Sequence, residues 1–213
     1  MMFESASPSI VRSVKQRDLL NTWLRLRSTI SARPSISEYN PVRIEDEIKD
    51  IVHYVVKRNE FSWQFIIDSN GSRLSQAYGT TDRNNIGTDL RDYVGPQMVD
   101  LVLPIYEECA NRELPTYSAS TIKDINGRTV VYERLLLPFF DRGAVSHIIA
   151  SLKTISEDGK FEINNLLRDP HRLPQYKIRA VIDQDLVVCQ TAIARATRTS
   201  ALPATGTSDV IEI

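Results

Sequence analysis

The sequence predicts an α+β domain, because two groups of strand-like segments are separated by helical ones. Alternating apolar and polar residues predict strands over Ile51–Lys57 and Phe61–Asp68, and the short polar link between them predicts a hairpin. After a helix-period segment, three more strand-like segments follow, at 116–123, 129–140 and 145–155. The turn residues Asn126-Gly127 and 141–143 separate these three, so we expect an antiparallel meander.

Two helices are predicted from apolar residues that recur at helical spacing. The first covers Val11–Arg27, and its apolar side chains fall broadly on one side of a helical wheel. The second covers 96–114 and starts with a proline, which suits the first turn of a helix. Pro34 and Pro41 indicate an irregular connection after the first helix, and the acidic stretch 44–50 is compatible with one short helix.

The chain divides into four parts. Residues 1–12 form an N-terminal arm, and residues 13–156 hold the domain with its first helix. The extension 157–189 carries one predicted strand, over 176–183, where apolar and polar residues alternate. Residues 190–213 consist mostly of Ala, Thr, Ser and Arg with little to bury, so we expect a flexible tail.

Composition and charge argue against two classes of partner, nucleic acids and membranes. The chain has 213 residues, with 26 Lys and Arg against 27 Asp and Glu, so no nucleic-acid partner is expected. The longest apolar runs are far shorter than the roughly 20 residues that cross a bilayer, and we expect no membrane partner. The first ten residues lack the pattern of a secretory signal, which favours a cytoplasmic location. Cys109 and Cys189 are too few for a disulfide framework or a zinc site, and we expect inert thiols.

No catalytic or metal-binding constellation is visible, so we expect a protein that is not an enzyme and that uses no cofactor and no metal. His53 and His147 fall on predicted strands, where a histidine satisfied by backbone groups is the common case. Arg168 and Arg172 have the R-x-x-x-R spacing of PilZ-type cyclic-dinucleotide receptors, but the second half of that signature is missing. A cyclic-dinucleotide receptor is therefore the less favoured alternative.

Several short segments resemble a compact bacterial branch of the PAS-like proteins, over about residues 13–155. The most specific is Tyr132–Pro138, which reads YERLLLP. The others are Trp23–Arg27, Tyr39–Pro41, Gly71–Leu74 and Ile86–Leu90. The resemblance implies a twisted five-stranded antiparallel sheet with helices on one face, preceded by the amphipathic N-terminal helix. It also implies a sensory or regulatory module without a defined chemistry.

The space between this expected sheet and its helices is the candidate ligand pocket. Its walls come from one strand and from the long helix: Phe61, Trp63, Phe65, Met98, Val102 and Tyr106. Tyr132 and Arg134 add polar groups if they point inward, and strand alternation alone leaves their direction open. An aromatic stripe of this kind is more often part of a plain core than of a pocket.

Two classes of function stay open. In the first, a small ligand enters the pocket and the domain acts as a sensory or regulatory module in signal transduction. In the second, the core is filled and the domain is a ligand-free dimerising adaptor or scaffold. For either class we expect a separate signalling protein as partner, and a homodimer that uses one face of the first helix: Leu20, Trp23, Leu24 and Leu26.

Overall fold

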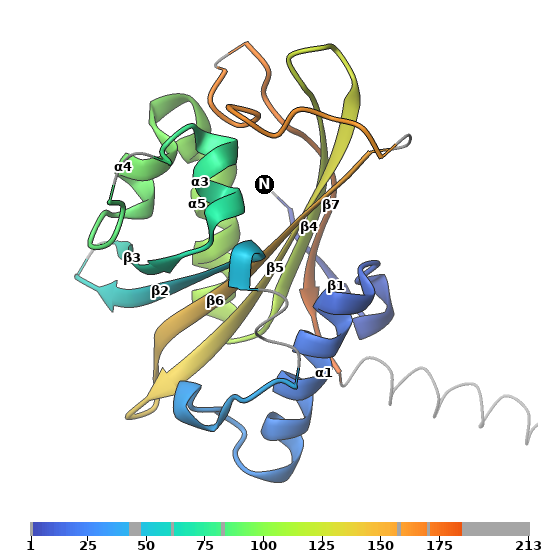
Figure 1. Ribbon diagram of the computed structural model, residues 1–213. Coiled ribbons are helices and arrows are strands. Elements are labelled where there is room, and N and C mark those ends of the chain that lie inside the picture. Colours follow the sequence, from blue (N-terminus) through green and yellow to red (C-terminus); the bar gives the residue numbers. More distant parts are fainter. Residues whose placement is uncertain are drawn as a thin grey trace, which may run out of the picture.

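The structure, a computed structural model, describes residues 2–42, 48–60, 62–81, 84–156, 159–169 and 171–184. Its strands form one sheet in the order β1-β7-β4-β5-β6-β2-β3 (Figure 1). The strands are β1 (Glu4–Ala6), β2 (Ile51–Arg58), β3 (Trp63–Asn70), β4 (Thr116–Lys123), β5 (Thr129–Asp141), β6 (Ala144–Ser156) and β7 (Gln175–Ile182). The α-helices are α1 (Val14–Thr29), α3 (Ser72–Tyr78), α4 (Leu90–Val94) and α5 (Pro96–Arg112). Short 3-10 turns are η1 (Pro8–Ile10), η2 (Ile36–Glu38) and η3 (Ile48–Asp50).

The elements expected from periodicity are present. The predicted hairpin is the antiparallel pair β2 and β3, and the predicted meander is β4, β5 and β6, whose neighbouring pairs are antiparallel. The long helix begins at Pro96 as expected, and the extension supplies the strand β7. Other predictions concern residues outside the described ranges: Phe61, Cys189, the tail 190–213 and residues 44–47 of the expected short helix.

The prediction of a five-stranded antiparallel sheet with helices on one face is wrong, although the α+β class holds. The sheet has seven strands and is mixed, because β1 pairs with β7 in parallel. β7 pairs with β4 in antiparallel fashion, with Ile178 opposite Ala119, and satisfies the N–H and C=O groups that β4 would otherwise expose at an edge. β1 then covers the last three residues of β7. A three-residue strand is too short to show a period in the sequence.

Helices cover both faces of the sheet, which is the second correction. Side chains alternate along β5, so the neighbours Glu133 and Arg134 point to opposite faces. Arg134 lies over the ring of Tyr106 in α5. Glu133 lies near Arg12 and Ser13 at the start of α1. Helices α1 and α5 therefore pack on opposite sides, and α3 lies on the α5 side (Figure 1).

Helix α1 uses its apolar face to cover the chain's own sheet. The indole nitrogen of Trp23 donates a hydrogen bond of 2.7 Å to the carbonyl oxygen of Pro138 in β5, and the Trp23 side chain is fully buried. Leu20, Leu24 and Leu26 are buried in the same core. The four residues expected to form a dimer surface therefore lie inside one chain. A homodimer stays a prediction, and it would need another surface.

An ion cluster centred on Asp50 joins α3 to β6. The Nζ atom of Lys153 donates a hydrogen bond of 2.6 Å to Oδ2 of Asp50, and Nε of Arg73 in α3 lies 3.1 Å from Oδ1. Asp50 and Lys153 are buried, so their attraction offsets the loss of hydration. Helix α3 begins directly after Gly71, where a Cβ atom would collide with the carbonyl oxygen of Lys49. This packing gives the Gly71–Leu74 segment a structural role.

We expect Trp23→Ala to lower the free energy of unfolding by about 3–5 kcal/mol, because it leaves a large cavity beneath α1. Trp63→Ala is the matched control. Trp63 is only half-buried, with the guanidinium of Arg58 4.9 Å from its ring centre, so less than about half of that loss is expected. Urea unfolding followed by circular dichroism measures both variants. Equal losses would contradict the assignment of α1 to the core.

Candidate functional site

The side chain of Arg134 on β5 is a charge enclosed in the core. It is only 2% exposed and lies on the face of the sheet that α5 covers. Its Nη2 atom donates a hydrogen bond of 3.3 Å to the hydroxyl of Tyr132, two residues earlier on the same strand. Its Cζ atom lies 5.5 Å from the ring centre of Tyr106 and 5.3 Å from that of Tyr132. Aromatic rings therefore line the guanidinium and attract it weakly.

Two of the three guanidinium nitrogens of Arg134 lack an acceptor. Nε and Nη1 are buried and have no hydrogen-bond partner among the described residues. In the part of the chain that the structure describes, Arg134 has no carboxylate within ion-pair distance. Arginine stays protonated inside proteins, so the site holds a full positive charge. A buried charge without a partner is strongly destabilising, and a fold gains nothing from it.

Five tyrosines, each from a different element, surround this charge. They are Tyr54 on β2, Tyr78 on α3, Tyr106 on α5, Tyr132 on β5 and Tyr176 on β7. Together with Arg134 we call them the tyrosine–arginine cluster. Tyr54 and Tyr106 meet edge to face, with ring centres 5.2 Å apart and hydroxyl oxygens 3.4 Å apart. The hydroxyl of Tyr176 is buried without a hydrogen-bond partner, so the cluster holds a second unused polar group.

Burial keeps the phenols of the cluster neutral. It raises the pKa of Tyr106 to about 12, because a buried phenolate would lose its hydration. For the same reason the pKa values of Tyr54 and Tyr78 lie well above the usual value, and that of Tyr132 is raised. At neutral pH these four phenols cannot neutralise Arg134, so the cluster keeps a positive charge.

The structure brings together half of the predicted pocket. Four of its eight candidate residues lie around one another: Phe65, Tyr106, Tyr132 and Arg134. The ring centres of Phe65 and Tyr106 are 5.4 Å apart. Val102 and Met98 are buried in α5 on the same side of the sheet, and Met98 also lines a neighbouring hollow. The direction of Arg134, which the sequence left open, is therefore inward.

Two predicted pocket residues do not join the cluster. Trp63, at the start of β3, donates a hydrogen bond of 2.9 Å from its indole nitrogen to Oδ1 of Asn111 near the end of α5. It is half-buried and covered by Arg58, so it belongs to the rim of the sheet. Phe61 lies outside the described residues.

Sequence reasoning missed three of the tyrosines: Tyr54, Tyr78 and Tyr176. Tyr54 shares a strand face with Val52 and Val56, which are buried, so period-two alternation could have found it. Tyr78 ends a seven-residue helix, and Tyr176 lies in the extension beyond the meander. Their approach to Arg134 depends on tertiary packing, which leaves no local pattern.

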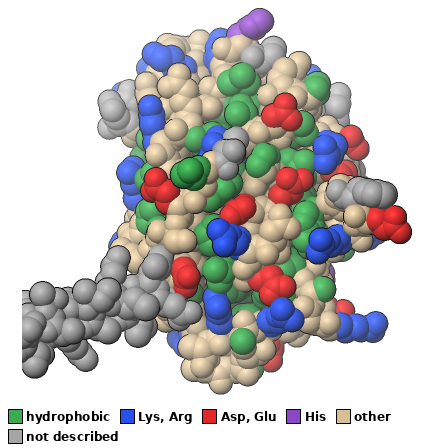
Figure 2. Space-filling model, turned by 180° about the vertical axis from the view of Figure 1, so that it is seen from behind, with side chains coloured by type: hydrophobic (Ala, Val, Ile, Leu, Met, Phe, Trp, Pro, Cys, Tyr) green, Lys and Arg blue, Asp and Glu red, His purple; other side chains and the backbone are tan. Residues whose placement is uncertain are grey.

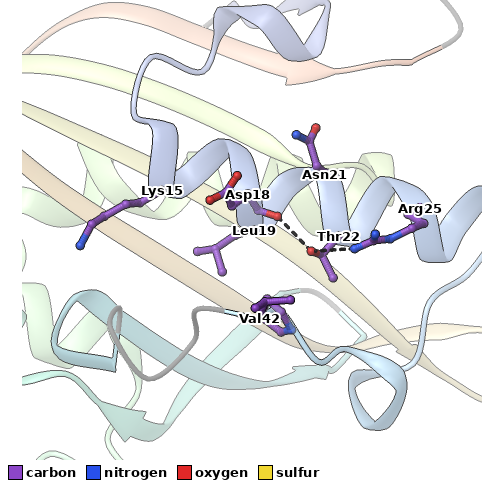
Figure 3. A pocket seen from close by; sticks show the side chains of 8 residues that line it. Lys15, Asp18, Leu19, Asn21, Thr22, Arg25 and Val42 are labelled. Atoms are coloured by element: carbon purple, nitrogen blue, oxygen red, sulfur yellow. Dashed lines mark hydrogen bonds between the residues drawn. The ribbon is translucent and has the colours of Figure 1, made fainter.

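A groove along the outer side of α1 is the main alternative site, with a volume of about 390 Å³ (Figure 3). Its walls are Lys15, Asp18, Leu19, Asn21, Thr22, Arg25, Pro41 and Val42. The hydroxyl of Thr22 donates to the carbonyl of Asp18 and accepts from Nη2 of Arg25, so these groups bond within the helix. None of the buried side-chain atoms that lack a partner in the described residues belongs to these walls. The groove therefore lacks the feature that marks Arg134, a buried polar group without a partner.

The cysteine, histidine and arginine residues that the sequence offered as other candidates are either kept in their neutral form by burial or bound to groups of the protein. Burial raises the pKa of the Cys109 thiol far above its usual value, so the thiol stays protonated. Burial also lowers the pKa of His53 on β2. In the R-x-x-x-R segment, Arg172 lies 3.0 Å from a carboxylate oxygen of Asp169, and Arg168 reaches the carbonyl of Gly79 at 3.5 Å. The two guanidiniums thus contact the protein itself.

The chain matches no family model, and a search of curated proteins finds no similar sequence. Within the described ranges, no three His, Cys, Asp or Glu side chains gather as metal ligands would. No helix in those ranges combines the length and the apolar character needed to span a bilayer. The tyrosine–arginine cluster is therefore the feature of this protein that bears most directly on its function.

We expect Arg134→Met to raise the free energy of unfolding of the ligand-free protein by about 1–3 kcal/mol, because it removes a buried charge and its unsatisfied donors. The attraction to the two rings that it sacrifices is worth about 1–2 kcal/mol. Arg112→Met, at the exposed end of α5, is the control and should change stability by less than about 0.5 kcal/mol. Urea unfolding measures both, on protein refolded from denaturant to remove bound molecules. A clear loss of stability in Arg134→Met would make Arg134 a structural residue.

Proposed function

We propose that this protein is a cytoplasmic sensory or regulatory module that binds a small organic anion at the tyrosine–arginine cluster. The observation that carries the proposal is the buried charge of Arg134, whose Nε and Nη1 atoms lack acceptors. Carboxylates match the geometry of guanidinium N–H groups, and such hydrogen bonds are stronger than neutral ones. An anion at this position would supply both the missing acceptors and the missing negative charge.

The surroundings of Arg134 favour an anion with an aromatic or apolar body. The rings of Tyr54 and Phe65 pack against that of Tyr106, which lies next to Arg134, and the buried hydroxyl of Tyr176 is a further polar group. Small-molecule sites are typically lined by apolar and aromatic side chains with a few convergent polar groups. Benzoate, a planar aromatic carboxylate, is therefore the simplest probe of this site.

Strand β5 offers a route by which binding could change the surface of the protein. Glu133, the neighbour of Arg134, points to the opposite face, where it lies near Tyr117 and the backbone of Ser13. Ser13 caps the start of α1. Burial raises the pKa of Glu133, and its Oε2 atom has no hydrogen-bond partner, so this contact is poorly satisfied. An anion that binds two arrangements of β5 and α1 with different affinities would shift the balance between them.

Output through a separate signalling protein, and a homodimer, belong to the same proposal. Acidic and basic side chains are intermixed over the face in Figure 2, which favours specific contacts over a general attraction to nucleic acid or anionic lipid. The Tyr132–Pro138 segment, which resembles PAS-like sensory proteins, contains Tyr132 and Arg134, and this supports a signalling role. The cytoplasmic location is supported by the buried free thiol of Cys109.

Native mass spectrometry of the full-length protein with benzoate tests the proposal. We expect the wild type and Arg112→Met to bind one benzoate, and Arg134→Met to bind none, because the charge and the donors are gone. Inorganic phosphate, used in parallel, shows whether an anion without an aromatic body is enough. If the wild type retains neither probe and purifies with no small anion, the proposal fails. That result would favour the alternative, a ligand-free dimerising adaptor with a solid core.

A further inference from the structure

A hollow of about 270 Å³ lies beside the tyrosine–arginine cluster. It is bounded by α3, α5 and the segment Glu162–Asp169, which we call the strap. Its walls include Tyr78, Gly79, Thr80, Tyr93, Met98 and Leu167. Figure 1 shows the chain after β6, in orange, passing over the end of α3 before it returns to the sheet as β7.

Tyr78 forms the boundary between this hollow and the buried charge. It lines the hollow and packs against Tyr93, with ring centres 4.9 Å apart. Tyr132 and Arg134 lie near enough to Tyr78 to influence its pKa. Arg168, at the rim of the hollow, is exposed to solvent. The layer that contains Tyr78 therefore separates a solvent-facing hollow from the tyrosine–arginine cluster.

Two backbone hydrogen bonds join the strap to the end of α3. The backbone N–H of Asn165 donates to the carbonyl of Gln76 at 2.9 Å. The N–H of Leu167 donates to the carbonyl of Ala77, also at 2.9 Å. These carbonyls belong to the last turn of α3, and that of Gln76 also accepts a hydrogen bond of 3.0 Å from the N–H of Gly79. Two residues of the strap itself, Leu166 and Leu167, have buried side chains that cover α3.

The start of the strap has a firmer anchor in the turn between β4 and β5. There Oδ2 of Asp124 accepts a hydrogen bond of 3.0 Å from the backbone N–H of Glu162. The other carboxylate oxygen of Asp124 accepts from the N–H groups of Asn126 and Arg128, so the anchor is fixed within its turn. A segment that lies outside the sheet and is joined to α3 by two backbone hydrogen bonds and two buried leucines can open locally while the sheet stays folded.

We propose that the strap is the gate of the anion site and that the hollow is its mouth. When the strap leaves α3, Leu167 and Tyr78 can move aside, and an anion can reach Nε and Nη1 of Arg134. When the strap closes, its leucines exclude water, which strengthens the attraction between the anion and Arg134. The other walls are less free to move, since α3 is tied to β6 through Asp50 and α5 packs on the sheet. This inference rests on the proposed function and adds how the site is reached.

The position of the strap on α3 depends on Gly79. Gly79 follows α3 with φ of 61°, in the left-handed region that favours glycine. A Cβ atom at this position would collide with the side chain of Asn165, so Gly79→Ala should displace that side chain and weaken the contact between the strap and α3. Gly87, between α3 and α4, has φ of 84° and open space around it. Gly87→Ala is therefore a control with similar backbone strain that lies outside both the strap and the turn that anchors it.

Hydrogen–deuterium exchange of the full-length protein tests the movement of the strap without any ligand. We expect Gly79→Ala to speed exchange of the strap amides by at least about tenfold and to leave β5 unchanged, because only local opening becomes easier. Gly87→Ala should leave the strap amides unchanged. Stopped-flow fluorescence with benzoate then tests the gate. Gly79→Ala should raise the association and dissociation rates by a similar factor and leave Kd within about twofold.

Leu167→Ala is a second variant that loosens the strap from its own side, with the exposed Leu173→Ala as its control. It should change exchange and benzoate rates in the same direction as Gly79→Ala, and it decides the matter if Gly79→Ala does not fold. Faster exchange of the strap with unchanged benzoate rates would overturn the gate and leave the anion site in place. If the wild type binds no anion, the gate falls together with the proposed function.

Discussion

The buried charge of Arg134 constrains the part of the core that lies between the sheet and α5. Strand alternation on β5 fixes the direction of this side chain, so the guanidinium cannot turn to solvent while the sheet is intact. The surrounding rings provide weak attraction, and Tyr132 provides one acceptor, but the described residues supply no negative charge. The core thus encloses a charge that it does not neutralise. Proteins keep such costly groups where a ligand completes them, and stability is lower as a consequence.

The extension after the meander gives this charge part of its enclosure. While β7 covers the edge of β4, it also places Tyr176 beside Arg134. The strap that leads to β7 brings Leu166 and Leu167 over the end of α3. One stretch of chain therefore completes the sheet and closes the site. This double role links the seven-stranded sheet, which the family resemblance did not imply, to the proposed binding site.

Local physics explains which parts of the structure could be predicted from the sequence. Alternation located the strands of the hairpin and the meander, and helical spacing located α1 and α5. The partners of β7 and β1 could not be predicted, because strand pairing over long sequence separations is decided by tertiary contacts. The apolar face of α1 that contains Trp23 is buried, as its pattern predicted. The pattern could not tell whether a sheet or a second chain covers this face, because both require the same apolar residues. Arg134 was a candidate from the sequence, whereas Tyr78 and Tyr176 reach it only through the fold.

A crystal structure of the protein, purified without any denaturing step, is the most direct measurement of the central claim. We expect electron density for a small anion in the tyrosine–arginine cluster, with an oxygen atom about 3 Å from Nε or Nη1 of Arg134. A carboxylate of the chain itself bound to Arg134, or a guanidinium in a fully packed core without any anion, would contradict the claim.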